Sequence, residues 1–450
     1  MDKFIITGGK PLQGEVTLGG AKNVALKLLV ASLLTDEELI IHNVPEIRDV
    51  ALMLEVLVSL GVKINRSGST VTAQNGHTNQ SRVPLDIGAR LRTSSMVIGP
   101  LLARYGKAMI PNPGGCRIGA RPIDRHITAL QQMGVTIKYR SEDGYFYANA
   151  PGGLTGTTFT FPKNSHTGTE TVMLAAVLAK GSTVIKNAAE EVEVDELISL
   201  LNLMGGKIVR SAPREITIEG VTSLHGADYT IMPDRNEEVT FAVAAAITGG
   251  EITVNGSQRD HLTAFLEVFR KAGGVYEAID ASRTRYSRGP NLCSVDVVTK
   301  SHPGFMTDWQ APWAVLMTQS MGTAAIHETV FENRFGYVEE LKKMGAQIVP
   351  HDPPVTDPEK FYNFNWEDHT PGDTHAIRIH GPTKLHNAIL TMNDLRAGAT
   401  LVLAALAADG QSVLHGVEHI DRGYEKIEER LGKLGAIIER HKEETVCIAL

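Results

Sequence analysis

A unit of one helix, one glycine and one strand recurs six times along the 450-residue chain, and this repeat restricts the possible folds more than any other feature. Each copy ends an amphipathic helical pattern at a glycine and continues as an extended apolar segment. The segments are LVSLGVKI, LQQMGVTI, LNLMGGKI, FRKAGGVY, LKKMGAQI and LGKLGAII, with glycines Gly61, Gly134, Gly205, Gly273, Gly345 and Gly435. Successive glycines are 73, 71, 68, 72 and 90 residues apart. We interpret this near-constant spacing as internal duplication rather than as chance recurrence of a common connection.

Glycine suits these helix ends because it enters the left-handed backbone region without a clash of a Cβ atom. Short strands in which β-branched and polar residues alternate precede the helices, as in GSTVIKN, GEITVNG, GTAAIHE and GQSVLHG. Strands and helices that alternate in this way are typical of α/β proteins. Because 450 residues exceed one ordinary hydrophobic core, the repeat predicts an α/β fold of two domains with three repeated subdomains each.

The last interval carries about twenty extra residues, which fall at about residues 350–373. This segment, PHDPPVTDPEKFYNFNWEDHTPGD, contains five prolines and many acidic residues, so it predicts a loop or hairpin. Its aromatic residues are Phe361, Tyr362, Phe364 and Trp366. A cluster of this kind can bind a partner, but in an ordered insertion it more often packs on its own domain, which is the interpretation we favour.

Composition excludes several classes of function. Hydrophobic residues make up 42% and charged residues 21% of the chain, and no window reaches the ~20 uninterrupted apolar residues of a membrane helix. The N-terminal segment MDKFIITGGK lacks the basic and apolar stretches of a secretory signal, so we expect a cytoplasmic protein. A formal net charge of −7 disfavours nucleic acid and anionic membranes as partners.

Motifs for metals and cofactors are missing from the sequence. The 16 histidines are dispersed without an HExxH pattern, and the cysteines form no paired motif. Neither the phosphate-binding pattern GxxxxGK[ST] nor a strand-linked GxGxxG pattern occurs, which disfavours nucleotide hydrolysis and nicotinamide redox chemistry. We therefore expect neither a metal nor a cofactor.

The cysteines indicate one reactive position. Cys116, Cys293 and Cys447 are too few for a disulfide framework and favour a reducing compartment. Cys293 and Cys447 lie in apolar runs that predict small buried hydrophobic residues. Cys116 instead lies in the glycine-rich segment NPGGCRIGARPIDRH, where the other repeats have an ordinary connection. Its arginines stabilise a thiolate and its glycines allow a closing lid, so a reactive thiol is predicted.

Motifs along the whole chain resemble one known family. GGAKN, PGGCRIGARP, MPDRNEE, HPGFMTDWQA, ETVFENRF, NDLRAG and HIDRGYEKIEE are similar to motifs of the UDP-N-acetylglucosamine enolpyruvyl transferases of peptidoglycan synthesis. The resemblance implies two inside-out α/β barrels, with helices within and sheets outside, that close over an active site. It also implies that residues 22–232, with Cys116, form one domain and that residues 1–21 join residues 233–450 in the other.

The reaction implied by this resemblance is addition followed by elimination. A sugar 3-hydroxyl attacks C2 of phosphoenolpyruvate while C3 gains a proton, and the proton and phosphate then leave. By resemblance, Cys116 is the general acid at C3, forms a covalent thioether with C2, and is the target of the inhibitor fosfomycin. Asp308 matches the residue that contacts or deprotonates the hydroxyl, although an aspartate there can also cap the following helix. Lys22 and Arg396 complete the implied catalytic set.

Both implied substrates are anionic, and their binding in a closing cleft requires several cations. The residues that match phosphoenolpyruvate ligands are Lys22, Asn23, Arg121, Arg396 and Arg422. The residues that match ligands of UDP-N-acetylglucosamine are Asn23, Arg92, Arg121, Pro122, Ile123, Asp124, Arg125, Lys163, Asn164, Ser165, His166, Asp308 and Val330. Because these residues come from distant repeats, we expect domain closure to bring them together.

Two segments depart from the usual family pattern. KNSHTGTE has His166 and Thr167 where a valine and a glycine commonly follow the serine. MPDRNEEVT has Glu238 and Val239 in place of the usual threonine and glycine. These changes leave open an enolpyruvyl transferase that acts on a different nucleotide. Two further alternatives are the shikimate 3-phosphate enzyme of the same fold, which normally lacks the cysteine loop, and a catalytically idle nucleotide-sugar sensor.

Overall fold

The structure is a computed structural model that describes residues 2–76, 80–114, 119–120, 122–351 and 353–442. Its contacts divide the chain into two compact units. Unit 1 contains the described residues of Met1–Gly19 and Pro233–Leu450, together with 119–120. Unit 2 contains those of Gly20–Gly115 and Pro122–Met232.

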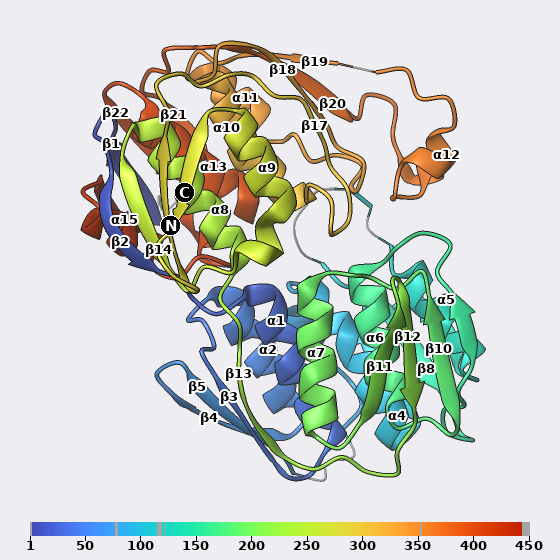
Figure 1. Cartoon of the computed structure of the whole chain (residues 1–450). Coiled ribbons are helices and arrows are strands. Elements are labelled where there is room, and N and C mark those ends of the chain that lie inside the picture. Colours follow the sequence, from blue (N-terminus) through green and yellow to red (C-terminus); the bar gives the residue numbers. More distant parts are fainter. Residues whose placement is uncertain (1, 77–79, 115–118, 121, 352, 443–450) are drawn as a thin grey trace, which may run out of the picture. The chain divides into compact units, whose positions relative to one another are not determined.

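Three helices fill the centre of each unit. They are α1 (Lys22–Ala31), α4 (Ile98–Tyr105) and α6 (His166–Ala176) in unit 2, and α8 (Arg235–Thr248), α10 (Gln310–Thr318) and α13 (Leu395–Ala407) in unit 1. Most residues of these helices are buried, and the C-terminal half of α8 is the continuous apolar run FAVAAAI. A helix that is apolar all round is stable only inside a core. In unit 1, α8, α10 and α13 accordingly pack against one another, with the sheets outside them (Figure 1).

Each unit has three sheets in the described part of the chain. In unit 2 their strand orders are β13 (Ala227–Thr230), β3 (Glu38–His42), β5 (Thr70–Asn75), β4 (Val62–Ser67); β6 (Lys107–Pro111), β8 (Tyr145–Asn149), β7 (Thr136–Arg140); and β11 (Lys207–Ala212), β12 (Glu215–Glu219), β10 (Ser182–Lys186), β9 (Thr158–Thr160). In unit 1 they are β21 (Ile389–Thr391), β22 (Gln411–His415), β1 (Asp2–Thr7), β23 (Ile437–Lys442); β15 (Gly274–Ala278), β16 (Arg283–Arg288), β14 (Glu251–Asn255), β2 (Gln13–Thr17); and β17 (Val297–Val298), β18 (Gly322–His327), β20 (Ala376–Gly381), β19 (Gln347–Pro350). The strand after each central helix pairs antiparallel with a central strand of its sheet. In the first repeat β3 pairs in this way with β5, and in the fourth β14 pairs with β16.

An outer helix joins the strands of each repeat and buries one face only. These helices are α2 (Arg48–Ser59), α5 (Asp124–Gln132), α7 (Val192–Leu203), α9 (Thr263–Lys271), α11 (Val338–Lys343) and α15 (Ile427–Lys433). In α9, for example, Phe265, Leu266 and Phe269 are buried, whereas Arg270 and Lys271 are exposed. Shorter elements are η1 (Ser32–Leu34), α3 (Leu85–Gly88), η2 (Arg92–Val97), η3 (Arg259–Leu262), η4 (Thr307–Trp309), α12 (Pro358–Phe361), η5 (Trp366–Asp368) and α14 (Val417–Ile420).

The six repeat glycines follow the six outer helices, and each has a φ between 87° and 98°. This backbone region is open to glycine and strained for residues with a Cβ atom. The predicted role of these glycines as helix ends is therefore confirmed at every copy.

Replacing Gly134 by alanine is expected to lower the free energy of unfolding by about 1–2 kcal/mol, because an L-residue is strained in the left-handed region. The φ of Gly134 is +93°, and an added Cβ would meet nothing within 4 Å, so the cost is conformational and not steric. Gly152 is the matched control, since it is equally open but lies outside the left-handed region. Urea unfolding of both variants measures the difference, and an equal effect of the two substitutions would contradict the prediction.

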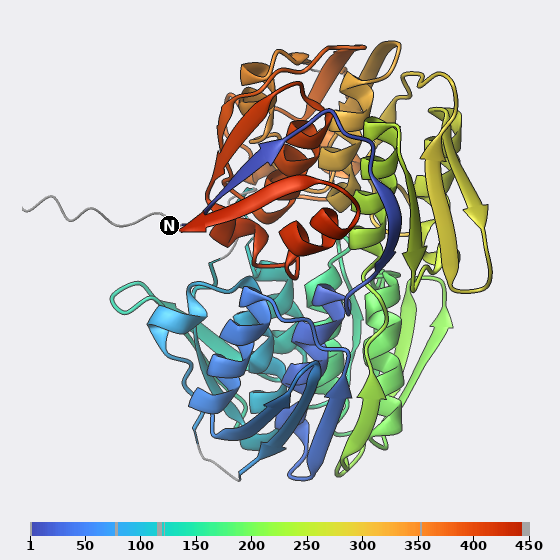
Figure 2. The same cartoon turned by 90° about the vertical axis from the view of Figure 1, so that its left-hand side faces the viewer.

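The N-terminal strand β1 completes the sixth repeat. It lies between β22 and β23 and pairs antiparallel with both, with Phe4 opposite Leu414 on one side and Arg440 on the other. Figure 2 shows this blue strand between the red strands of the chain's last repeat. In the other five repeats the strand in this position comes from the same repeat, directly after the strand that follows the glycine. The first and last strands of the described residues, β1 and β23, therefore share one sheet.

The insertion packs against its own unit. Tyr362 and Phe364 are buried, and the rings of Tyr362 and Trp366 are stacked with centroids 5.1 Å apart. The Tyr362 hydroxyl lies 3.0 Å from Nε2 of His327, the last residue of β18. This arrangement agrees with the interpretation of the aromatic cluster as part of its own domain, although Phe361 at the edge is 44% exposed.

Cys293 is exposed, so the prediction of a buried residue was wrong. Side chains alternate between the two faces of an extended segment, and Leu292 next to it takes the inward position with 4% exposure. The apolar run therefore did not specify which of its members would face the core. Among the described residues, no helix is long and apolar enough to span a bilayer.

Candidate active site

Several of the predicted site residues lie at or just before the N-terminal ends of central helices, each within its own unit. Lys22 and Asn23 begin α1, Arg92 begins η2 before α4, His166 begins α6, Asp308 lies in η4 before α10, and Arg396 lies in the first turn of α13. The first backbone N–H groups of a helix have no partner within the helix, and the helix dipole places partial positive charge there. These ends are therefore suited to phosphate and carboxylate groups.

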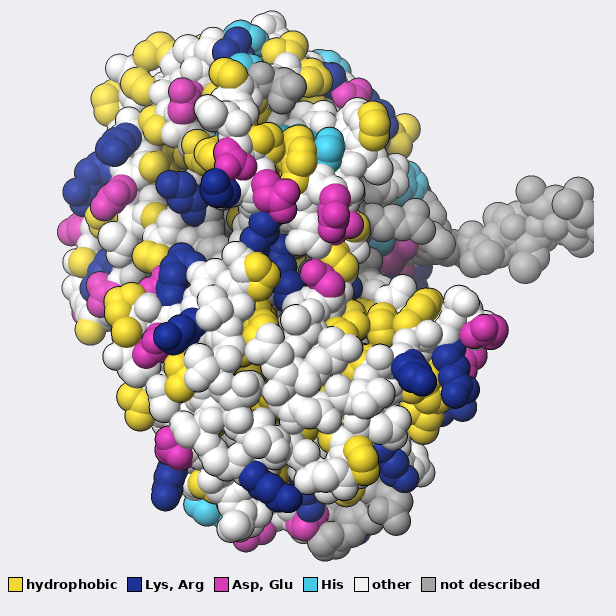
Figure 3. All heavy atoms as spheres, turned by 90° about the vertical axis from the view of Figure 1, so that its right-hand side faces the viewer, with side chains coloured by type: hydrophobic (Ala, Val, Ile, Leu, Met, Phe, Trp, Pro, Cys, Tyr) yellow, Lys and Arg dark blue, Asp and Glu magenta, His cyan; other side chains and the backbone are white. Residues whose placement is uncertain are grey.

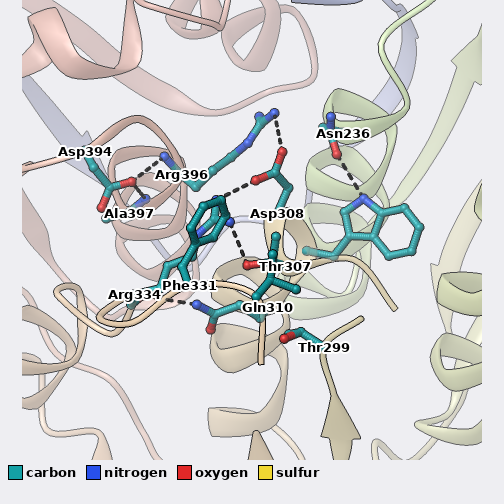
Figure 4. A network of polar contacts seen from close by, with 12 residues as sticks. Asn236, Thr299, Thr307, Asp308, Gln310, Phe331, Arg334, Asp394, Arg396 and Ala397 are labelled. Atoms are coloured by element: carbon teal, nitrogen blue, oxygen red, sulfur yellow. Dashed lines mark hydrogen bonds and ion pairs between the residues drawn. The ribbon is translucent and has the colours of Figure 1, made fainter. Parts of the chain in front are cut away.

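Asp308 lies between two arginines in unit 1 (Figure 4). Its Oδ1 accepts a hydrogen bond of 2.5 Å from Nη2 of Arg334, and its Oδ2 lies 3.5 Å from Nη2 of Arg396. The side chain of Asp308 is 19% exposed, whereas both arginine side chains are 7% exposed. The N-cap positions of η4 and α10 are Met306 and Trp309, so the capping role considered for Asp308 is not what the structure shows. One partly accessible carboxylate is thus held by two buried cations.

The sequence did not identify Arg334 as a site residue. Its Nη1 donates to the hydroxyl of Thr307 over 2.7 Å, and that hydroxyl donates to Oε2 of Glu328 over 2.7 Å. Burial lowers the pKa of Arg334, but the carboxylates of Asp308 and Glu328 raise it more, so the net shift is upward. The signal for Arg334 was its place in ETVFENRF, a motif that carried the resemblance but in which only Val330 was assigned a role.

Arg396 has a second contact on its other side. Its Nη1 donates to the Tyr424 hydroxyl over 3.1 Å, and that hydroxyl lies 2.7 Å from the Thr240 hydroxyl. Burial lowers the pKa of Arg396, but Tyr424 and Asp308 outweigh this effect and raise it. The N-cap residue Asp394 accepts from the backbone N–H of Arg396 over 2.9 Å, which fixes the start of α13.

The other two site residues predicted in unit 1 are only partly buried. Arg422 lies between α14 and α15, and Val330 lies after β18. The backbone N–H of Val330 donates to Oε1 of Glu328 over 2.7 Å. Cys116, predicted to act at the reacting carbon, and Arg121, predicted to bind both substrates, lie outside the described residues, as does Cys447.

Lys22 in unit 2 forms a buried ion pair. Its Nζ lies 2.7 Å from Oδ2 of Asp49 in α2, and the two side chains are 11% and 3% exposed. Asn23, the next residue of α1, is half-buried. The ammonium group is therefore held at the start of a helix, where positive charge is already present.

The residues predicted to contact the nucleotide sugar are linked in two pairs within unit 2. Nη2 of Arg92 donates to the carbonyl of Pro122 over 3.1 Å, and Nη1 of Arg125 donates to the carbonyl of Asn164 over 3.0 Å. Ser165 caps α6 by accepting from the N–H of Gly168 over 3.1 Å. The exposure of the remaining members differs: Ile123 is buried, Lys163 is half-buried, and Pro122 and Asp124 are exposed.

The unusual His166 belongs to a small ionic cluster in unit 2. Its Nε2 lies 3.1 Å from Oε1 of Glu170 and 3.2 Å from Nζ of Lys27, and Lys27 is 2.9 Å from the same carboxylate oxygen. Burial lowers the pKa of His166, but the carboxylates of Glu170 and Glu191 together outweigh this effect, so the net shift is upward. This departure from the family pattern thus adds a second basic group, at the start of α6, to the ion pair between Lys27 of α1 and Glu170.

The second departure from the family pattern lies in the core of unit 1. Glu238 is buried and accepts a hydrogen bond of 2.6 Å from the Tyr286 hydroxyl, and burial raises the pKa of its carboxyl group. Val239 is fully buried. These two residues therefore serve the packing between α8 and β16, whereas Glu237 nearby forms an ion pair of 2.7 Å with Arg430.

Acid is expected to destabilise the protein through His126, which lies in α5 with its Nε2 3.0 Å from the Thr167 hydroxyl. Burial, then the positive charges of Arg92 and Arg125, lower its pKa from 6.5 to about 3. Between these two pH values the unfolded chain binds a proton that the folded chain does not, so the free energy of unfolding falls as the pH is lowered from 6.5. The His126→Gln variant should lose this dependence, which amounts to at most about 3 kcal/mol between pH 7 and 4.5.

Urea unfolding at the two pH values measures this effect. The exposed His225 provides the matched control, since His225→Gln should keep the pH dependence of the unmodified chain. The same acid destabilisation in the His126 variant and in the unmodified chain would contradict the prediction.

Comparison with solved structures identifies the fold. The enolpyruvyl transferase NikO from Streptomyces tendae has a TM-score of 0.85 at 24% identity and covers 98% of this chain and 99% of its own. An EPSP synthase from Acinetobacter baumannii has a TM-score of 0.72 at 18% identity, with 98% of this chain and 100% of its own covered. Together with the central helices and outer sheets of each unit, these similarities define a protein of the enolpyruvyl transferase fold, as predicted.

Sequence comparison then gives the family. The chain belongs to the EPSP synthase (3-phosphoshikimate 1-carboxyvinyltransferase) family, whose profile matches residues 6–431. A relative from Allorhizobium ampelinum is 42% identical over 98% of this chain and 99% of its own length, and is named UDP-N-acetylglucosamine 1-carboxyvinyltransferase. A relative from Acidobacterium capsulatum with the same name is 44% identical over 98% of this chain and 96% of its own length. The prediction of a carboxyvinyl transferase is thereby confirmed.

Proposed function

We propose that this chain transfers the enolpyruvyl group of phosphoenolpyruvate to the 3-hydroxyl of UDP-N-acetylglucosamine and releases phosphate, the first committed step of peptidoglycan synthesis. The observation that carries the proposal is the 42–44% identity, over nearly the whole chain, to relatives named for this acceptor. The motif segment around Cys116 supports it over the shikimate 3-phosphate alternative, which normally lacks a cysteine there. Asp308, Arg396 and Lys22 supply the acid–base and cationic groups that the reaction needs.

The proposed reaction divides the work among a few side chains. Asp308 takes the proton of the 3-hydroxyl as its oxygen attacks C2 of phosphoenolpyruvate, and Cys116 donates a proton to C3. The resulting tetrahedral adduct then loses a proton from C3 to the Cys116 thiolate and the phosphate from C2, and the proton held by Asp308 leaves with the phosphate, so that the enolpyruvyl ether and inorganic phosphate are formed and both side chains return to their starting states. Lys22 and Arg396, with Arg121 and Arg422, bind the carboxylate and phosphate of phosphoenolpyruvate. We propose that residues 22–232 and residues 1–21 with 233–450 act as the two domains of this cycle.

The proposal includes a cytoplasmic location, fosfomycin as a covalent inhibitor at Cys116, and no nucleic acid or membrane partner. A protein of net charge −7 repels both polyanionic surfaces at long range. On the face shown in Figure 3, the described Lys and Arg side chains lie interspersed with Asp and Glu rather than in one basic patch. The substrates are therefore the only partners that the proposal needs.

One assay tests the proposed function against its alternatives. The purified chain is incubated with phosphoenolpyruvate and UDP-N-acetylglucosamine, and both phosphate release and product mass are measured. We expect equal amounts of phosphate and of the enolpyruvyl nucleotide sugar. Parallel reactions with shikimate 3-phosphate and with other nucleotide sugars test the two enzyme alternatives. Binding of UDP-N-acetylglucosamine without any phosphate release would instead support the idle sensor and reject the proposal.

A further inference from the structure

Glu328 is a fully buried carboxylate that accepts four hydrogen bonds in unit 1. It follows β18 directly and has 0% exposure. Its Oε1 accepts from the Thr299 hydroxyl over 3.0 Å and from the backbone N–H groups of Val330 and Phe331 over 2.7 and 3.2 Å, and its Oε2 accepts from the Thr307 hydroxyl over 2.7 Å. Burying a carboxylate is costly without such partners. Burial raises the pKa of the Glu328 carboxyl group, whereas the Arg334 charge and these hydrogen bonds oppose that shift. The carboxyl group therefore lies at a place where it organises several other groups.

One of these contacts leads to Asp308 through a chain with a fixed direction. Arg334 can only donate, so the Thr307 hydroxyl must accept from its Nη1 over 2.7 Å. The single proton of that hydroxyl is then available for Oε2 of Glu328. Nη2 of the same guanidinium group donates to Oδ1 of Asp308, as Figure 4 shows. The orientation of Asp308 thus depends, through Arg334 and Thr307, on Glu328 as an acceptor.

A second contact leads to the segment predicted to bind the nucleotide sugar. The N–H groups of Val330 and Phe331 are both bound to Oε1 of Glu328, which fixes the backbone directly after it. The guanidinium carbon of Arg334 also lies 5.1 Å from the centre of the Phe331 ring. The two oxygens of one buried carboxylate therefore act on different parts of the proposed site. Oε2 is linked to the proposed base Asp308, and Oε1 holds the backbone of Val330, a proposed contact of the nucleotide sugar.

We propose that Glu328 is a positioning residue for the reaction, which holds Asp308 through Thr307 and Arg334 with one oxygen and the backbone of residues 330–331 with the other. This inference rests on the proposed function. Glu328 itself touches no reacting atom in this scheme. Its effect on turnover comes from the placement of Asp308, and a misplacement of about 1 Å in a catalytic group can lower a rate by about 10²-fold.

The Glu328→Gln variant separates the two oxygens. A glutamine oxygen in place of Oε1 keeps the acceptor for Thr299, Val330 and Phe331. The amide nitrogen in place of Oε2 is a donor, so the Thr307 hydroxyl can no longer donate to this position, and Thr307 and Arg334 lose the negatively charged acceptor that anchors them. We expect kcat to fall at least about tenfold while KM for UDP-N-acetylglucosamine changes less than about threefold. The acid limb of the pH profile of kcat/KM should also move to higher pH, because a displaced guanidinium stabilises the Asp308 anion less.

Two variants of Thr307 check the route. Thr307→Val removes the hydroxyl and should show the same loss in kcat as Glu328→Gln. Thr307→Ser keeps the hydroxyl and should retain most of the kcat of the unmodified chain. The double variant Glu328→Gln with Thr307→Val should lose no more than either single variant, because both break the same link. Glu238→Gln is the matched control, since this buried glutamate of unit 1 is bound to Tyr286 and its substitution should leave kcat unchanged.

The outcomes are distinct. A Glu328→Gln variant with wild-type kcat would overturn the inference but leave the proposed function intact. A variant in which kcat, substrate affinity and Tm all fall together would show a merely structural role for Glu328 and would overturn the inference in the same way. Independent, additive losses from the Glu328 and Thr307 variants would overturn it too. Absence of turnover in the unmodified chain with phosphoenolpyruvate and UDP-N-acetylglucosamine would reject the proposed function, and the inference with it.

Discussion

Replacing Asp308 by alanine is expected to lower kcat by about 10²–10⁴-fold, the range typical for loss of a positioned general base. KM for UDP-N-acetylglucosamine should change far less, because most of the proposed nucleotide contacts lie on other residues. The carboxylate is 19% exposed and bound by Arg334 and Arg396, so it combines a fixed orientation with access for a hydroxyl group. Steady-state phosphate release at varied acceptor concentration measures both constants.

Asp308→Asn sharpens this test, since the amide keeps the shape of the side chain but cannot take up a proton. It should lose nearly as much turnover as the alanine variant. The exposed Asp280, which pairs with Arg283 over 2.7 Å, is the matched control, and Asp280→Asn should retain full activity. Equal losses in turnover and in nucleotide affinity for the Asp308 variants would make Asp308 a binding residue rather than a base.

Replacing Cys116 by serine is expected to lower turnover by at least about 10²-fold and to abolish covalent labelling by fosfomycin. A serine hydroxyl is far less acidic than a thiol, so it is both a weaker proton donor to C3 and a weaker nucleophile at neutral pH. Mass spectrometry of the protein after incubation with fosfomycin, with and without the substitution, measures the labelling directly.

Cys293 provides the control for this experiment because its thiol is exposed and lies in the same chain. Cys293→Ser should retain both turnover and labelling. Labelling that persists in Cys116→Ser and disappears in Cys293→Ser would overturn the assignment of Cys116 as the reactive thiol.

Local features of the fold could be predicted because they depend on neighbouring residues. The glycines at the helix ends are set by backbone sterics within one or two residues, and all six have the expected positive φ. The C-terminal half of α8, FAVAAAI, is apolar on all sides, and this property of a buried helix can be read directly from the sequence. The side toward which Cys293 points was not predictable from its apolar run, because alternation within an extended segment has two possible registers.

The site could be predicted only where a motif carried a residue role. Asp308 and Arg396 were named from their motifs, and the structure brings them within 3.5 Å of each other. Arg334 and Glu328 were missed, although both lie in the motif ETVFENRF. Nothing in that motif tells which of its polar residues faces Asp308, since the contact depends on how β18 and η4 lie in the folded unit.

The sequence by itself determined the repeat, the class of fold and the positions where each helix ends, because these follow from periodicity and from the conformational freedom of glycine. Only the tertiary structure decided that β1 completes the sixth repeat between β22 and β23, and that Arg334 meets a carboxylate 26 residues away. Such contacts join residues distant in the chain, and their geometry is set by the packing of whole elements, not by the local preferences of the residues that form them.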